Sequence, residues 1–180
     1  MNKDLSRKIE LPKGMKATLN GEELTLSMNG KEIKKKMSLH GVSLVIEGNS
    51  IIVSFNAATR RESAIIGTTW AHINNMIKGF SEEYVYELEI CNLHFPMNVK
   101  KEGNKVVVKS FLGEKKDRIA DILSGVNVEV SGNKITVSSS NRESAGQTAA
   151  NLERATRLTN RDRRIFQDGI FLTSRCGRKI

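Results

Sequence analysis

Apolar and polar residues alternate through residues 125–138, and this pattern predicts β-strands because successive strand side chains point to opposite faces. Valine occupies every other position up to Val130, and the alternation resumes at Ile135. A two-residue turn at Gly132 and Asn133 would pair Val130 with Ile135 and bring both apolar sets to one side. The stretch therefore predicts an antiparallel hairpin with one apolar face.

The same pattern occurs earlier in the chain, at residues 41–54. Seven of its fourteen positions are identical to those of the later stretch, at a separation of 84 residues. A turn at Gly48 and Asn49 suits this copy too, because it pairs Ile46 with Ile51. Self-similarity at a fixed spacing indicates a repeated structural unit, so the chain is expected to contain two copies of one fold.

A helix is expected after each hairpin. Thr59 and Glu62 in the first copy, and Ser140 and Glu143 in the second, have the spacing of a capping box. Apolar residues then recur at helical steps and should face the sheet. Trp70 belongs to this stripe, so packing in the core is favoured over stacking on a base. The stripes are Ile66, Trp70, Ile73 and Ile77, then Ala145, Ala149, Leu152 and Ala155.

Further strand-like runs precede the hairpin in each copy. Two good hairpin connectors, Asn29-Gly30 and Gly103-Asn104, separate these runs. The runs are residues 23–28 and 31–37 in the first copy, and residues 99–101 and 105–109 in the second.

These elements predict an α+β fold, a tandem duplication of a small antiparallel sheet with one helix packed on one face. Residues 84–90 alternate as well and are expected to link the copies, which leaves a boundary near Ser81. The expected domains are therefore residues 1–81 and residues 82–180.

The chain is basic, and its positive charge is unevenly distributed. It has 29 Lys and Arg against 20 Asp and Glu, a net charge of +9. The last 40 residues alone carry +5, and they contain eight of the twelve arginines. Arginine binds phosphate through its planar fork and stacks on bases, so nucleic acid is the expected partner. A plain solvated surface is the weaker alternative.

Three consecutive segments are expected to form the RNA-binding surface. Arg154 and Arg157 are spaced i, i+3 and would share one face of the second helix. Residues 159–164 are too polar for a core and predict a loop, while the basic tail at residues 174–179 is expected to be unordered when free. Such a surface would contact RNA phosphates and 2′-hydroxyl groups. Its basic residues are Arg154, Arg157, Arg161, Arg163, Arg164, Arg175, Arg178 and Lys179.

Residues 31–36 of the first copy have the sequence KEIKKK and contain four lysines. This pattern is typical of an edge strand that charge protects from pairing with another chain. A secondary contact with RNA is the alternative interpretation.

No catalytic constellation is recognisable in the sequence. None of the three histidines lies in an HxH or HExxH spacing, and the glycines form neither a dinucleotide-binding nor a P-loop motif. Glu153, Asp162 and Asp168 have arginines near them, so structural pairing is expected. We therefore expect no enzyme activity, no cofactor and no metal.

The sequence also argues against a membrane protein. No signal peptide is expected at the first residues, and no stretch approaches the length of apolar residues that a membrane-spanning helix needs. Cys91 and Cys176 are isolated in the sequence and are expected to be reduced thiols of a cytosolic protein. A disulfide or a zinc site is the minor alternative.

Five separated motifs lie at residues 71–79, 94–96, 111–115, 146–151 and 161–171. These motifs resemble the large-subunit ribosomal protein six family in its archaeal and eukaryotic form. They cover nearly the whole chain in the right order. The resemblance implies a tandem pair of α+β domains and a structural protein that binds ribosomal RNA.

The resemblance also implies a place in the cytoplasm, within the large ribosomal subunit near the sarcin–ricin loop and the stalk base, supporting the factor-binding region. The C-terminal domain would be the main RNA-binding half, which adds Lys115 and Lys116 to the arginines above. Large-subunit rRNA and neighbouring large-subunit and stalk-base proteins would be the partners, with no membrane and no small-molecule substrate. The alternatives are an RNA-binding regulatory module acting off the ribosome and an adaptor that pairs through a sheet edge.

Overall fold

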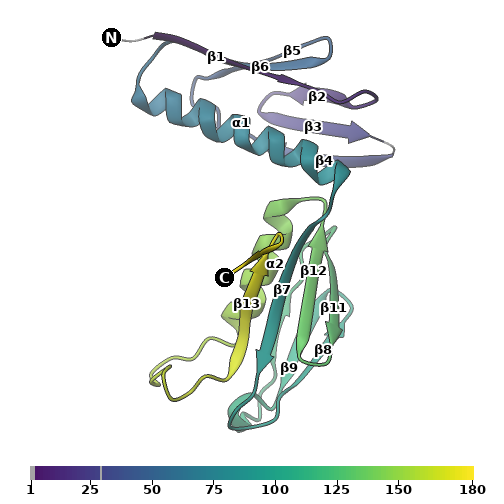
Figure 1. The fold of residues 1–180 in the computed structure, drawn as a ribbon, viewed down its shortest axis with the longest axis vertical. Coiled ribbons are helices and arrows are strands. Elements are labelled where there is room, and N and C mark those ends of the chain that lie inside the picture. Colours follow the sequence, from purple (N-terminus) through teal and green to yellow (C-terminus); the bar gives the residue numbers. More distant parts are fainter. Residues whose placement is uncertain (1–2, 29) are drawn as a thin grey trace. The chain divides into compact units, whose positions relative to one another are not determined.

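The chain divides into two compact units, Met1–Glu82 and Glu83–Ile180, each with its own hydrophobic core. The structure is a computed structural model, and it describes residues 3–28 and 30–180. Figure 1 shows the elements of both units. Those of the first unit are β1 (Lys3–Glu10), β2 (Lys16–Asn20), β3 (Glu23–Met28), β4 (Lys31–Lys36), β5 (Ser43–Glu47), β6 (Ser50–Ala58) and α1 (Arg60–Ser81).

The second unit repeats the element order of the first and adds two strands after its helix. Its elements are β7 (Tyr84–Cys91), β8 (Asn98–Glu102), β9 (Lys105–Lys109), the 3-10 turn η1 (Phe111–Gly113), β10 (Arg118–Asp121), β11 (Asn127–Ser131), β12 (Lys134–Ser139), α2 (Arg142–Ala155), β13 (Gly169–Arg175) and β14 (Arg178–Lys179).

The α+β class and the duplication are confirmed, but the described residues of each unit form two sheets where one was expected. In the first unit the sheets have strand orders β1-β6-β5 and β2-β3-β4. In the second unit the orders are β11-β12-β7-β13-β14 and β10-β9-β8. All the strand pairs are antiparallel.

Both central hairpins have the predicted register. Ile46 lies opposite Ile51 in the β5–β6 pair, and Val130 lies opposite Ile135 in the β11–β12 pair. Gly48 has a φ of 56°, the left-handed value that the first position of a type II′ turn requires and that glycine adopts without strain. The alternation of apolar residues and the turn chemistry therefore agree in both copies.

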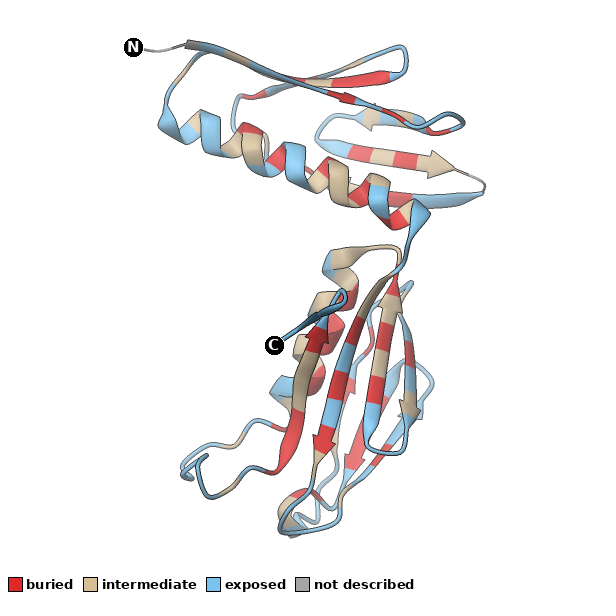
Figure 2. Ribbon diagram, in the orientation of Figure 1, coloured by how far each residue is buried: buried red, intermediate tan, exposed pale blue. Residues whose placement is uncertain are grey.

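β1 and β7 hold the same place in their units. β1 pairs with β6, the second strand of one hairpin, and β7 pairs with β12, its counterpart in the other. A matching hydrogen bond extends each pair: the Leu11 amide donates to the Asn49 carbonyl at 2.9 Å, and the Ile90 amide donates to the Asn133 carbonyl at 2.8 Å. β7, which was expected to link the copies, is thus the central strand of a sheet, with burial that alternates along it (Figure 2).

The first helix begins and packs largely as predicted. The capping box at Thr59 is confirmed, since its backbone amide donates to the Glu62 carboxylate at 3.0 Å. Ile66 and Ile73 have no exposed surface, and Ile77 packs against the same core while only partly buried. This apolar stripe lies on β6 and β1.

Trp70 is 38% exposed, so the prediction that it belongs to the core is wrong. The buried stripe of α1 passes one residue before it, through Thr69, and continues at Met76. Trp70 lies instead beside β1, with the Arg7 guanidinium 5.4 Å from the centre of its ring.

The second helix has a different N-cap from the one predicted. Asn141 caps it, because its side-chain oxygen accepts a hydrogen bond from the Glu143 amide at 3.0 Å. The preceding Ser139 hydroxyl accepts from the Asn141 amide at 3.1 Å and fixes this entry. The capping box predicted at Ser140 is therefore wrong by one residue. The stripe is correct for Ala145, Ala149 and Leu152, which are buried, while Ala155 is partly buried.

The smaller sheets bear out two further predictions. β4 is an edge strand of its sheet, and its lysines Lys34 and Lys36 form surface ion pairs with glutamates. The turn at Gly103 is confirmed, because the strands on either side of it pair directly. The turn predicted at Asn29-Gly30 includes Asn29, which lies outside the described residues.

Candidate RNA interface

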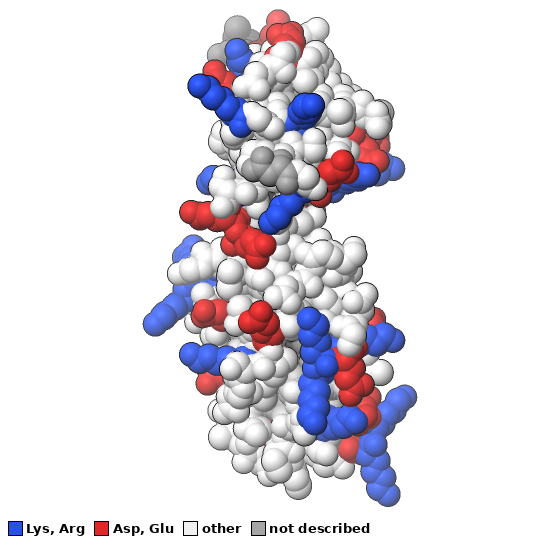
Figure 3. Space-filling view, turned by 90° about the vertical axis from the view of Figure 1, so that its right-hand side faces the viewer, with Lys and Arg blue, Asp and Glu red and all other residues white. Residues whose placement is uncertain are grey.

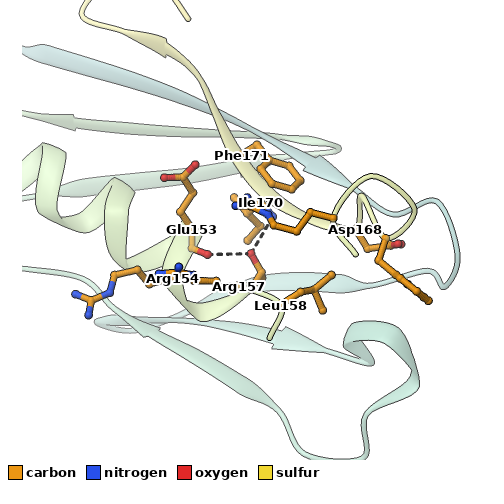
Figure 4. A pocket seen from close by; sticks show the side chains of 10 residues that line it. Glu153, Arg154, Arg157, Leu158, Asp168, Ile170 and Phe171 are labelled. Atoms are coloured by element: carbon orange, nitrogen blue, oxygen red, sulfur yellow. Dashed lines mark hydrogen bonds between the residues drawn. The ribbon is translucent and has the colours of Figure 1, made fainter. Parts of the chain in front are cut away.

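α2 ends at Ala155, and residues 156–168 contain the predicted loop. The start of this loop is tied to β13 by Thr156, which is only 3% exposed. The Thr156 hydroxyl accepts from the Ile170 amide at 2.9 Å and donates to the Glu153 carbonyl at 3.4 Å, and Figure 4 draws both bonds. The loop therefore leaves the helix and joins the strand at one fixed place.

Asp168 ties the end of the loop to the connection between β7 and β8. Its side chain is 1% exposed, and its carboxylate lies 2.9 Å from the His94 amide and 2.5 Å from His94 Nδ1. Burial raises the pKa of Asp168, but the hydrogen bonds from the His94 amide and ring outweigh it, so the pKa lies below its ordinary value. The expected pairing of Asp168 with an arginine is wrong, because a histidine distant in the sequence takes that role.

Phe166 positions one of the loop arginines. The His94 ring stacks on Phe166 with 5.0 Å between centroids, and the Arg161 guanidinium lies 4.7 Å from the centre of the Phe166 ring. A guanidinium near an aromatic ring in this way gains cation–π attraction and loses freedom. The sequence does not show that Phe166 supports an arginine. Its position as an aromatic residue among arginines is the one signal that could have pointed to it.

Arg164 is held by an acidic neighbour within the loop. Its guanidinium makes a two-pronged contact with the Asp162 carboxylate, the shortest distance being 2.7 Å. Hydrogen bonds from the Arg164 side chain and amide lower the pKa of Asp162, and the same side-chain bond raises the pKa of Arg164. The predicted structural pairing of Asp162 is confirmed.

Arg118 on β10 supports the helix end from below, and no sequence pattern singles it out. Its guanidinium donates to the Ala155 carbonyl at 3.0 Å and the Arg157 carbonyl at 3.2 Å, near the negative end of the α2 dipole. The same group binds both oxygens of Glu114, at 2.7 and 2.8 Å, and lies 4.3 Å from the centre of the Phe111 ring. Arg118 thereby connects α2 with the segment that carries Lys115 and Lys116.

The structure brings several of the predicted arginines together around this helix end. Arg154, Arg157 and Arg163 line one hollow of about 210 Å3, beside Phe166 and Phe171 (Figure 4). Their side chains come from the last turn of α2, from the residues directly after it and from the loop. Arg157 lies beyond the end of the helix, so the prediction that it shares a helical face with Arg154 is wrong, although both line the same hollow. The name "loop site" is used below for Lys115, Lys116, Arg154, Arg157, Arg161, Arg163 and Arg164.

The basic tail is an ordered hairpin, and it does not join the loop site. Arg175 at the end of β13 lies opposite Arg178 of β14, and both residues of the turn, Cys176 and Gly177, have positive φ. The expectation of an unordered tail is therefore wrong. β13 also separates this hairpin from the loop by its seven residues, about 20 Å of strand, so the single continuous surface that was expected is wrong as well (Figure 1). Arg175, Arg178 and Lys179 are exposed and are called the hairpin site below.

Two lysines elsewhere in the second unit are paired with aspartates. Lys105 lies 3.9 Å from Asp121, and Lys109 lies 3.8 Å from Asp117, in exposed ion pairs. On the face drawn in Figure 3, positive and negative side chains are intermixed. Pairing of this kind is typical of solvated surface and contributes little to stability.

The described residues contain neither a metal-binding cluster nor a membrane-spanning helix. Across residues 3–28 and 30–180, no three His, Cys, Asp or Glu side chains are grouped so as to hold a metal ion. Neither helix in these residues is long and apolar enough to cross a membrane. Cys91 and Cys176 are free thiols, and burial, followed by Glu89 and Asp168, raises the pKa of Cys91.

A duplicated α+β scaffold with an anchored, arginine-bearing loop has the features of a structural nucleic-acid-binding protein. The family model for Ribosomal protein L6 matches residues 11–83 and 95–169, one segment in each unit. This chain belongs to the Ribosomal protein L6 family, whose members are structural proteins and not enzymes.

Archaeal proteins are similar to this chain over almost its full length. The large ribosomal subunit protein uL6 of Methanococcus vannielii is 40% identical over 98% of this chain and 97% of its own. The uL6 protein of Methanocella arvoryzae is 41% identical over 94% of this chain and 96% of its own. That of Methanosarcina mazei is 38% identical over 97% and 99%.

Proposed function

We propose that this chain is a structural constituent of the large ribosomal subunit that binds large-subunit rRNA through the loop site of its second unit. It works in the cytoplasm as part of that particle, next to other ribosomal proteins. Its place is near the sarcin–ricin loop and the stalk base, where it supports the region that binds translation factors. The observation that carries the proposal is an anchored loop with arginines on a chain of the Ribosomal protein L6 family.

The anchoring of the loop favours binding because a fixed loop loses little conformational freedom when RNA arrives. Thr156 and Asp168 hold its two ends, and Phe166 holds Arg161 between them. Arg154, Arg157 and Arg163 are exposed around one hollow and are free to contact phosphates bidentately. Contacts of this kind recognise the folded shape of RNA more than its sequence.

The hairpin site would make a second, separate contact. Arg175, Arg178 and Lys179 lie at the other end of β13 and reach a different part of the RNA if both sites bind at once. Two linked contacts of moderate strength give an affinity well above that of either one.

Binding of the purified chain to a large-subunit rRNA fragment that contains the sarcin–ricin loop tests the proposal. With about five phosphate contacts, log affinity should fall with log salt at a slope of about −4. Replacing Arg161, Arg163 and Arg164 together by Ala should weaken binding by roughly tenfold or more and flatten the slope. The matched control replaces Arg60, Arg61 and Lys78 of α1 by Ala, which removes the same charge from the first unit.

Absence of binding at moderate salt, or equal losses in both triple variants, would reject the loop site. The location is tested separately, by sedimentation of cell extracts. Nearly all copies should travel with large subunits, whereas a large free pool would favour the regulatory alternative.

A further inference from the structure

The duplication leaves one strand edge filled in the second unit and open in the first. β7 has β12 on one side and β13 on the other. β1, its counterpart, has β6 on one side, and within residues 3–28 and 30–180 no strand pairs with its other edge. The second unit therefore shows what a filled edge looks like at this position of the fold.

The open edge of β1 presents free backbone groups. The two-residue turn makes Glu47 and Ser50 the hydrogen-bonded pair that closes the β5–β6 hairpin. Along β6, the backbone groups of successive residues point alternately toward β5 and toward β1, and the residue opposite Arg7 points toward β1. The backbone groups of Arg7 therefore face β6, and those of Ser6 and Lys8 face outward.

The same positions are occupied in the second unit. Val85 is the counterpart of Ser6, and its carbonyl accepts from the Cys176 amide, at the turn after β13, at 2.8 Å. Glu87, the counterpart of Lys8, lies opposite Ser174 of β13. The outward groups of β1 are thus the ones that its copy uses to hold a strand.

The helix beside this edge, α1, is also exposed at a place where its counterpart, α2, is covered by a strand. In the second unit β13 packs against α2 and buries Ile170, which is 1% exposed. In the first unit Trp70 of α1 lies beside β1 and is 38% exposed. The Arg7 guanidinium lies over its ring, and no carboxylate pairs with Arg7 in the described part of the chain.

We propose that the outer edge of β1 binds an extended segment of another protein as an additional antiparallel strand. The segment has two apolar residues opposite Leu11 and Ile9, as Ile170 and Leu172 lie opposite Ile90 and Leu88 in the copy. The residue of the segment that lies opposite Arg7, on the same face as these two, is an Asp or Glu, and its carboxylate pairs with Arg7. Main-chain hydrogen bonds supply the affinity, while Trp70 and Arg7 select the side chains.

The occupant is a peptide strand and not RNA, because the outward backbone amides and carbonyls of Ser6 and Lys8 have the spacing of a strand ladder. The charges of Arg7 and Lys8 also favour an acidic segment over a basic one, and they protect the edge from unselective pairing. This inference concerns the first unit and does not depend on RNA binding by the loop site.

Trp70, the only tryptophan of the chain, reports on the proposed site directly. The probe is an acetylated peptide of residues 169–175 that omits the bulged Thr173 and carries the Arg175→Glu change. Titration into the full chain should shift the Trp70 emission to shorter wavelength and saturate. The same peptide with arginine retained should bind roughly fivefold more weakly.

Two changes test the pairing geometry. In β13 the backbone of Phe171 faces β7 and that of Leu172 faces away, so N-methylation of the peptide at Phe171 should weaken binding roughly tenfold. N-methylation at Leu172 is the matched control and should be tolerated. In the chain, Arg7→Glu should reverse the preference between the acidic and basic peptides.

Hydrogen exchange gives an independent readout. The amides of Lys8 and Glu10, which lie opposite the peptide and face outward, should become protected when the acidic peptide is present, while those of Arg7 and Ile9 should change little. The proposal is overturned if Trp70 does not respond, if the two N-methylated peptides bind equally, or if protection appears only in the second unit. A concentration-dependent dimer that excludes the peptide would likewise overturn it in favour of a second copy as the occupant.

Discussion

Arg118 illustrates how much of the loop site depends on a side chain outside it. Its guanidinium satisfies two carbonyls at the end of α2, holds the Glu114 carboxylate and covers the Phe111 ring. Hydrogen bonding from Arg118 lowers the pKa of Glu114. The end of the helix, the β10 strand and the lysine-bearing segment therefore share one support.

Replacing Arg118 by Met should lower the free energy of unfolding by about 2 kcal/mol, because helix-end carbonyls lose their donor and Glu114 loses its partner. Urea denaturation of the second unit's structure measures this loss. Arg157→Met removes the same charge from an exposed side chain and should change stability by less than about 0.5 kcal/mol. Equal effects of the two changes would contradict the role given to Arg118.

Asp168 should make the free energy of unfolding of the second unit depend on pH in the acidic range. Its pKa is lowered on folding, so the carboxylate contributes stability above its ordinary value of 3.8 and loses it as pH falls through the lower folded value. Asp168→Asn should therefore cost about 1 to 2 kcal/mol near neutral pH, and the difference from the parent should shrink below about pH 4. Denaturation at several pH values provides the measurement, and a constant difference would argue against the carboxylate.

At the scale of elements, the two candidate caps of α2 can be separated by mutation. Asn141→Ala should lower the free energy of unfolding by about 1 kcal/mol, because the Glu143 amide loses its acceptor. Ser140→Ala is the matched control and should change it by less than about 0.5 kcal/mol. A larger effect at Ser140 would restore the cap predicted from the sequence.

The elements that the sequence reveals are the ones with local signals. The β5–β6 and β11–β12 hairpins have alternation and a turn within a few residues, so both strands and their register are predictable. β13 has no such signal, because its partner β7 lies some eighty residues earlier and the run at Gly169–Arg175 does not alternate cleanly. β1, β2 and β10 also have no strong local pattern, so the sequence does not predict them.

The candidate site divides along the same line. Charge alone identifies the arginines of the loop, and the local pairing of Asp162 with Arg164 follows from their closeness in sequence. The supports come from far away in the chain: His94 reaches Asp168 across 74 residues, and Arg118 reaches Ala155 across 37. Contacts over such separations are set by the tertiary fold, which no local pattern contains.

At the scale of the whole molecule, two separate cores imply two unfolding events. Trp70 lies in the first unit, so its fluorescence should follow the unfolding of that unit alone. Arg118→Met should lower the urea midpoint of the second unit, which is measured through the amide protection of α2. The midpoint of the Trp70 transition should not change. A shift of both transitions together would show that the chain unfolds as one cooperative body.

β13 has one more consequence, for what happens when it is missing. A chain cut before Gly169 would lose the strand that covers β7, and the outward amides and carbonyls of Val85, Glu87 and Glu89 would lie bare beside an uncovered α2. Such a fragment would have two unpaired strand edges of the same kind, one on each unit. Molecules with two such edges can pair strand to strand in an open-ended chain. We therefore expect the fragment to form filaments or precipitate under conditions in which the intact chain stays dispersed.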